Sequence, residues 1–235
     1  MAAEKKTIVL FNVFAKKCRK TAILKIPVYT QRRSAWYNES RRIPVRIPLE
    51  KEMKRGVFFM IIHAADAEKA HLMRTAEAMA AAARTAPKTK GADFIETLIL
   101  EGEELEKLAA AMETVAQESG TAFFTRDANC IRRSGAVLVV GIGYHARGLG
   151  DLCGYCGLGG CSACTEQGAA CVFDSIDLGI ALGSAVSIAA DNRVDTRIMF
   201  SAGVGVKKLG LLPEEAKIVF GIPLSISGKS PYFDR

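Results

Sequence analysis

Five of the seven cysteines in this 235-residue chain lie within nineteen residues, close enough to act together on one metal centre. They are Cys153, Cys156, Cys161, Cys164 and Cys171, with the spacing C-x2-C-x4-C-x2-C-x6-C. A C-x2-C turn points two sulfurs at one centre, and the intervening glycines let the backbone wrap closely around it. This pattern predicts an iron–sulfur cluster of the 4Fe–4S type, which needs four thiolates.

Three ligands, Cys153, Cys156 and Cys161, follow from the spacing, and the fourth is either Cys164 or Cys171. Zinc is the alternative metal, because Cys161 and Cys164 would supply a second C-x2-C pair of the kind that binds structural zinc. The odd number of cysteines and the lack of a recognisable secretory signal argue against disulfides. The spacing therefore favours iron–sulfur over zinc and leaves the fourth ligand open.

Positive charge is concentrated in the first quarter of the chain, where residues 1–59 carry 15 lysines and arginines against 4 glutamates. The chain as a whole has a net charge of only +7, so residues 60–235 are mildly acidic. We expect a basic extension over 1–59, disordered or preceding a natural start at Met60, and a separate domain over 60–235 with its cluster segment at 145–172. A nucleic-acid role for the extension, with Trp36 beside Arg33, is the less favoured alternative.

No uncharged apolar run reaches the roughly 18–20 residues that span a bilayer. The longest candidate, residues 178–190, is shorter and rich in glycine, alanine and serine. We therefore expect a cytoplasmic protein that does not associate with membranes.

Hydrophobic periodicity predicts an α+β domain around the cysteines. Helices are expected over 65–86, 103–118, 175–190 and 202–209, and strands over 94–100, 122–125, 136–142 and 217–222. The strand 136–142 is apolar and β-branched, so we expect it to lie at the centre of the sheet and to lead directly into a cysteine-rich loop, 143–171. Asp174 or Ser175 is expected to cap the helix after this loop.

No group of side chains in the sequence indicates acid–base or nucleophilic catalysis. His63 and His71 flank the first predicted helix and are expected on the surface, whereas His145 precedes the cysteines and could couple a proton to reduction. The bound group would then supply the chemistry, in electron transfer to a redox partner protein or in an oxidoreductase. A cluster or zinc ion with a structural or redox-sensing role is the alternative.

Four separated blocks of residues 60–235 resemble an uncharacterised family of ferredoxin-domain-containing proteins of anaerobic bacteria and archaea. The blocks are 82–88 (AARTAPK), 153–157 (CGYCG), 173–184 (FDSIDLGIALGS) and the C-terminal 221–224, 228–229 and 233–235 (GIPL, GK and FDR). The resemblance implies a 4Fe–4S cluster whose fourth ligand is the cysteine just before the third block, Cys171. The C-G-x-C-G-x3-C core is also similar to the 4Fe–4S motif of corrinoid iron–sulfur proteins.

The outline of the domain is also similar to the flavin-dependent nitroreductases. This resemblance rests on Ala86-Pro87 before a strand and on residues 210–213 and 221–223, and it implies a mixed sheet flanked by helices in a homodimer that binds FMN. Lys88 and Gly91 replace the Ser and Asn of the flavin motif, and the R-R-S-x-R phosphate motif is missing, so FMN is not favoured. Cations that could still neutralise a flavin or other phosphate are Arg84, Lys88, Lys90 and Lys229.

Overall fold

The computed structural model describes residues 61–233, so the predictions made for residues 1–59 lie outside the described residues. The described residues belong to a unit that runs from Met60 to Arg235, and the domain boundary expected at Met60 stays a prediction. In chain order the elements are α2 (Ala64–Thr85), β1 (Ile95–Glu101), α3 (Glu103–Ser119), α4 (Phe123–Arg132), β2 (Ala136–Ile142), α5 (Cys161–Glu166), α6 (Val172–Asp191), β3 (Asp195–Thr196), α7 (Phe200–Lys208) and β4 (Ile218–Ser225).

The sheet has the strand order β1-β2-β4-β3. The expected α+β class, with helices flanking a sheet, is confirmed, and the pairs within the described residues are antiparallel where a mixed sheet was expected. The direction follows from the connection between β1 and β2. Helices α3 and α4 pack on each other and return the chain to the end of the sheet where β1 finishes, so Ala136 pairs with Glu101.

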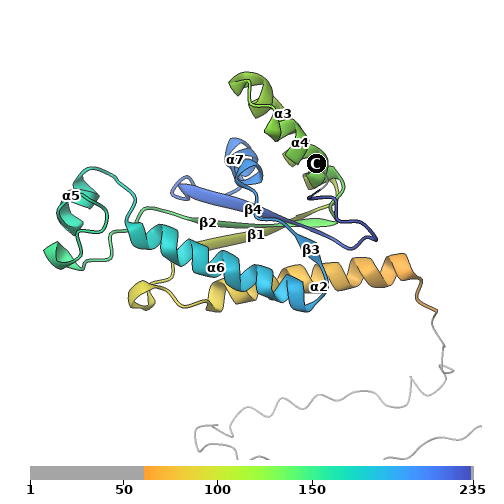
Figure 1. Ribbon diagram of the computed structural model, residues 1–235, viewed down its shortest axis with the longest axis horizontal. Coiled ribbons are helices and arrows are strands. Elements are labelled where there is room, and N and C mark those ends of the chain that lie inside the picture. Colours follow the sequence, from red (N-terminus) through yellow and green to blue (C-terminus); the bar gives the residue numbers. More distant parts are fainter. Residues whose placement is uncertain (1–60, 234–235) are drawn as a thin grey trace, which may run out of the picture. The chain divides into compact units, whose positions relative to one another are not determined.

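Helices cover both faces of the sheet, with α2 and α6 side by side on one face and α3, α4 and α7 on the other (Figure 1). All seven residues of β2 are buried, as expected for a central strand. Because successive side chains of a strand point to opposite faces, Leu138 and Val140 join the core under α2 and α6. Val137 and Val139 join the core under α3 and α7.

Helix α6 is apolar because it is a core helix. It is the only helix among residues 61–233 that is long and apolar enough to span a membrane by length and composition, but a core helix passes the same test. Leu178, Ala181, Leu182 and Ala185 of α6 lie in the core beneath the sheet. Within residues 61–233, this helix is therefore no evidence of a membrane segment.

The strand predicted over 122–125 is wrong, because this segment lies in helix α4. The two phenylalanines and the threonine favour a strand locally, but the buried residues recur at helical spacing, as Phe124, Ala128 and Ile131 show. They pack in the core that α3 also lines. Tertiary packing therefore overrides local β-propensity here.

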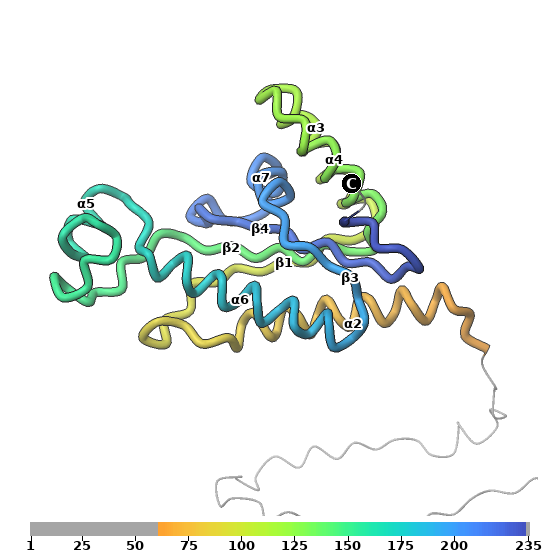
Figure 2. Tube along the Cα trace, viewed as in Figure 1, coloured from red at the N-terminus to blue at the C-terminus, as the bar shows by residue number. Residues whose placement is uncertain are grey.

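The start of α6 also differs from the prediction, since the helix begins at Val172 and its N-cap is Cys171 rather than Asp174 or Ser175. Asp174 occupies the third helical position, where its side chain and that of Cys171 form a reciprocal capping box. The last cysteine of the segment is thus built into the start of a long core helix. The cysteine-rich segment between β2 and α6, which contains α5, projects beyond one end of the sheet (Figure 2).

The close packing of α7 on β4 gives a prediction for Gly203. A Cβ atom at this position would lie 1.9 Å from the carbonyl oxygen of Val219. We expect Gly203→Ala to lower the free energy of unfolding by about 2–3 kcal/mol, because the backbones of α7 and β4 must move apart.

The matched control is Gly179→Ala on α6, where an added Cβ meets no atom within 4 Å. A glycine-to-alanine change inside a helix should stabilise it by about 0.5–1 kcal/mol. Urea unfolding of both variants tests this, and equal stability of Gly203→Ala and the unsubstituted protein would contradict the described packing.

Candidate metal centre

The free cysteines of the cysteine segment, residues 143–171, differ in how far they are buried. Cys153, Cys156 and Cys161 are partly buried, whereas Cys164 and Cys171 are buried. The glycines that follow Cys153 and Cys156 have positive φ angles, +55° and +77°, which only glycine adopts readily. The chain can therefore reverse direction directly after each of the first two cysteines.

The later cysteines are held by regular structure. Cys161 and Cys164 lie one turn apart in α5, and the Sγ of Cys161 accepts the backbone N–H of Leu149 at 3.3 Å. Backbone N–H groups that donate to sulfur tune the electronics of thiolate ligands. Cys171 is the N-cap of α6, and its side chain accepts the backbone N–H of Asp174.

Cys164 lies in an environment shared with two other cysteines. Burial raises the pKa of the Cys164 thiol, and a hydrogen bond with Cys156 and the nearby charges of Cys156, Cys171 and Asp174 raise this pKa further. Its Sγ also donates to the carbonyl oxygen of Ala169 at 3.4 Å. Cys156, Cys164 and Cys171 are thus close enough to influence one another.

The donor set fits an iron–sulfur cluster in type and number, with five free thiols on one glycine-rich segment. Within residues 61–233, no three His, Cys, Asp or Glu side chains are already gathered as they would be around a metal ion. Cys153 and Cys156 lie on the loop and Cys161 on the short helix α5, so the segment would have to move to bring their sulfurs around one metal centre.

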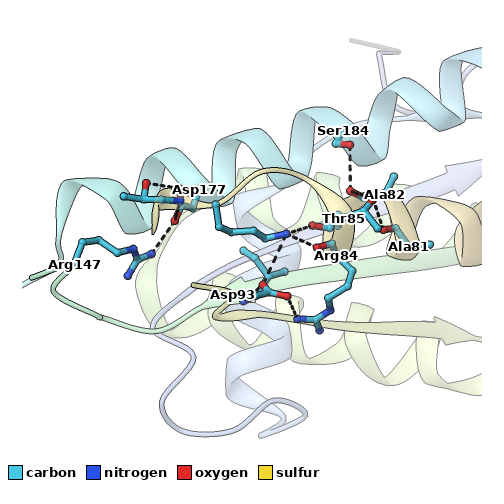
Figure 3. A network of polar contacts seen from close by, with 12 residues as sticks. Ala81, Ala82, Arg84, Thr85, Asp93, Arg147, Asp177 and Ser184 are labelled. Atoms are coloured by element: carbon cyan, nitrogen blue, oxygen red, sulfur yellow. Dashed lines mark hydrogen bonds and ion pairs between the residues drawn. The ribbon is translucent and has the colours of Figure 1, made fainter. Parts of the chain in front are cut away.

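A buried ion-pair network lies directly under the segment. The guanidinium of Arg147 pairs with Asp174 at 2.8 Å and with Asp177 at 2.9 Å, the contact drawn in Figure 3. These three side chains are at most 2% exposed. Asp177 also accepts the backbone N–H and the hydroxyl of Thr89, at 3.0 and 2.9 Å. Burying such a network is costly, and among the described residues the Nε of Arg147 and the Oδ1 of Asp174 have no hydrogen-bond partner of good geometry.

Sequence reasoning missed this network. Asp174 was expected as a helix cap, which it is in part, but nothing in the pattern paired Asp177 or Arg147 with a partner. A lone arginine in a glycine-rich loop resembles an exposed residue, and only the tertiary fold shows that it is buried.

His145 lies at the base of the segment, with its ring stacked on Phe94 at a centroid distance of 3.9 Å. Its Nδ1 is buried and has no hydrogen-bond partner among the described residues. The ring also lines an open cavity of about 320 Å³, together with Tyr144, Gly168, Glu214, Glu215 and Lys217. Of the other histidines, His63 is exposed as expected, and His71 is partly buried and contacts the carbonyl oxygen of Asn192.

Three of the four predicted phosphate-binding cations lie near the end of α2. Arg84 pairs with Asp93 at 2.7 Å (Figure 3), and the side chain of Lys88 is only 4% exposed. Lys88 donates to the carbonyl oxygen of Ala83 at 2.8 Å and also to that of Arg84, so it caps the C-terminus of α2. Lys90 is exposed in a left-handed conformation, with φ of +59°.

Lys229 does not join these three cations. It follows β4, which ends at Ser225 beside Asp195, and the preceding residue Leu224 pairs with Ala136 at the start of β2. Arg84, Lys88 and Lys90 precede β1, whose first residue Ile95 pairs with the opposite end of β2. The two groups thus approach opposite ends of the central strand.

Comparison with known proteins identifies relatives of this chain. The family model described as "uncharacterized protein containing a ferredoxin domain" matches residues 167–235, a range that includes Cys171. An uncharacterized protein of Archaeoglobus fulgidus is 45% identical over 184 residues, which cover 75% of this chain and 98% of that protein.

Solved structures with a partly similar fold include nitroreductases. One from Desulfitobacterium hafniense DCB-2 with bound FMN is 16% identical, with a TM-score of 0.46 over 66% of this chain and 78% of that chain. A nitroreductase family protein from Clostridium novyi NT is also 16% identical, with a TM-score of 0.44 over 71% and 76% of the two chains. Such scores mark a partial likeness, and nothing about a cofactor or substrate follows from it.

The position of Lys88 generates a prediction that separates a structural from a phosphate-binding role. We expect Lys88→Met to lower the free energy of unfolding by about 1–3 kcal/mol, because the last carbonyls of α2 lose their donor. The exposed control Lys90→Met should change it by less than about 0.5 kcal/mol.

Urea unfolding measures both effects, and isothermal titration with inorganic phosphate and with FMN measures binding. Unchanged stability of Lys88→Met, combined with weaker binding of phosphate or FMN, would assign Lys88 to a ligand instead of to the fold.

Proposed function

Because the chain belongs to a family of uncharacterized proteins that contain a ferredoxin domain, we propose that it is an iron–sulfur protein with a role in electron transfer or oxidoreduction. The family supports a redox role in general terms. The 4Fe–4S type of cluster is supported by this chain's own residues, above all by the five free thiols on the glycine-rich segment.

A 4Fe–4S cluster, when bound, supplies one-electron redox chemistry, and the protein sets its position and its reduction potential. Cys153, Cys156 and Cys161 would provide three thiolates. The N–H of Leu149, which already donates to Cys161, would help to set the potential. Around the segment, Leu152 and Tyr155 are 99% and 73% exposed, which leaves an apolar surface for a redox partner protein to approach.

Cys171 is the proposed fourth ligand. It caps α6, so its sulfur is held in place by a core helix. Cys164 is the competitor, since it is buried beside Cys156 and Cys171, and its raised thiol pKa disfavours the thiolate in the metal-free protein. The arrangement therefore supports Cys171 and leaves Cys164 as a nearby fifth thiol.

A zinc or cluster site with a structural or redox-sensing role is the second candidate function. It is favoured by one observation, that Cys161 and Cys164 form a regular pair on α5 like the second pair of a zinc site. Bound zinc would decide for this second function, because zinc has no redox chemistry. A bound cluster would be assigned to it only if the cluster showed no reversible reduction.

FMN binding by this chain is supported only by its sequence resemblance to the flavin-dependent nitroreductases. Among the predicted cations, we retain Lys90 for a phosphate, because its side chain is exposed. Its Nζ also lies close to Gly148, in the glycine-rich loop. Arg84 and Lys88 are engaged with Asp93 and with α2. Titration with FMN tests this proposal, and an unchanged affinity in Lys90→Met would contradict it.

We further propose that the protein is a cytoplasmic homodimer. The outward side of α6 carries Ile176 and Ile180, which are 43% and 41% exposed in the single chain and are suited to an interface. Sedimentation velocity tests the dimer, and a single species at the mass of one chain would contradict it. Cell fractionation tests the location, and recovery in the membrane fraction would contradict it.

The cysteine assignment gives a prediction for iron content. Cys153→Ser and Cys156→Ser should each remove most of the iron and sulfide from anaerobically purified protein, because each removes a ligand. Cys171→Ser should do the same, whereas Cys164→Ser should retain the cluster.

The control is Cys130→Ser, which changes a buried thiol in the other core. It should leave the iron content unchanged. Full iron and absorbance in Cys171→Ser, with loss in Cys164→Ser, would transfer the fourth ligand to Cys164.

A further inference from the structure

One carboxylate joins the two ends of the cysteine segment. The Oδ2 atom of Asp174 accepts the backbone N–H of His145 at 3.0 Å and that of Cys171 at 3.1 Å. His145 precedes all five clustered cysteines in the chain, and Cys171 is the last of them. The segment is therefore a loop whose base is closed by a single buried oxygen atom.

Arg147 holds this carboxylate in place. Its guanidinium pairs with the other oxygen, Oδ1 of Asp174, and with Asp177 one turn further along α6. The same guanidinium lies 4.9 Å from the ring centroid of Phe94, which stacks on His145. Two ion pairs thus connect the loop side of the base to helix α6, and the aromatic stack connects the loop to Phe94, just before β1.

We propose that Asp174 and Arg147 act as a clasp that holds the cysteine segment closed before any metal binds, so that Cys164 and Cys171 are positioned in advance. Arg147 is then a positioning residue for the metal centre and does not touch the metal. The consequence for metal binding rests on the proposed function, but the clasp itself is a property of the metal-free chain.

The physical basis of the clasp is the cost of closing a long loop. Ordering a flexible loop of this length costs conformational entropy, and a site that must pay this cost on binding has a lower affinity for its metal. Without Arg147, two fully buried carboxylates would lose their counter-charge, which favours opening of the base toward water. Opening would expose Cys164 and Cys171, which are 2% and 6% exposed in the closed form.

The test compares Arg147→Met with a matched control in the metal-free full-length protein. Arg132 also joins two carboxylates, those of Glu106 and Glu113 at 2.9 and 2.6 Å, but it lies on α4, away from the cysteine segment. Each protein is treated with a thiol-alkylating reagent below its unfolding temperature, and the rate at each cysteine is read by peptide mass spectrometry. Arg147→Met should speed the labelling of Cys164 and Cys171 about tenfold or more, whereas Arg132→Met should not.

Cys130 serves as an internal reporter of global unfolding, because it is 3% exposed and is one of the residues by which α4 enters the core that α3 also lines. A general loss of stability would speed the labelling of Cys130 together with that of Cys164 and Cys171. If Arg147→Met labels these three cysteines in parallel, or labels none faster than Arg132→Met does, the clasp is refuted. If Arg147→Met does not fold, Asp177→Asn replaces it, and a smaller selective increase at Cys164 and Cys171 is expected.

A second readout separates the clasp from the proposed function. After anaerobic reconstitution with iron and sulfide, Arg147→Met should lose iron to a chelator several-fold faster than Arg132→Met does. Selective thiol exposure in a protein that binds no iron at all would keep the clasp and overturn the iron–sulfur proposal. Equal iron retention with equal thiol protection would overturn the clasp and keep the proposal.

Discussion

The ion pairs between Arg147 and the two aspartates of α6 are the interaction on which the candidate site depends. They bury two carboxylates and one guanidinium where β2, α6 and the turn at Thr89 meet. Buried charges of this kind seldom add net stability, but removing one partner is costly, because the others are left unpaired. Here the ion pairs matter for geometry, because they fix the base of a long glycine-rich loop that has little regular secondary structure of its own.

The rest of the fold provides the frame that makes this burial feasible. The central strand β2 is buried along its whole length and delivers the chain to Gly143, where the cysteine segment begins. Helix α6 contributes core residues such as Leu178 and Leu182 along one side, so its first turn cannot shift freely. Because Cys171 caps this helix, the last cysteine is positioned by the hydrophobic core as well as by the carboxylate of Asp174.

Much of this frame could be predicted from the sequence, because periodicity is strong where helices and strands bury one side. The helix over Ala64–Thr85, the strand over Ala136–Ile142 and the loop between β2 and α6 were expected with nearly the right limits. The segment at Phe123 was not, since aromatic residues suit a strand locally and only packing against α3 makes it a helix. Arg147 could not be identified as a buried residue, because its partners lie 27 and 30 residues away and no short-range pattern encodes them.

The measurement that tests the central claim most directly is the metal and sulfide content of the protein after anaerobic purification, together with its absorbance spectrum. The account predicts about four irons and four sulfides per chain and a broad absorbance near ~400 nm that bleaches on reduction. Stoichiometric zinc without sulfide or a chromophore would contradict it, and would make the cysteine segment a structural clip.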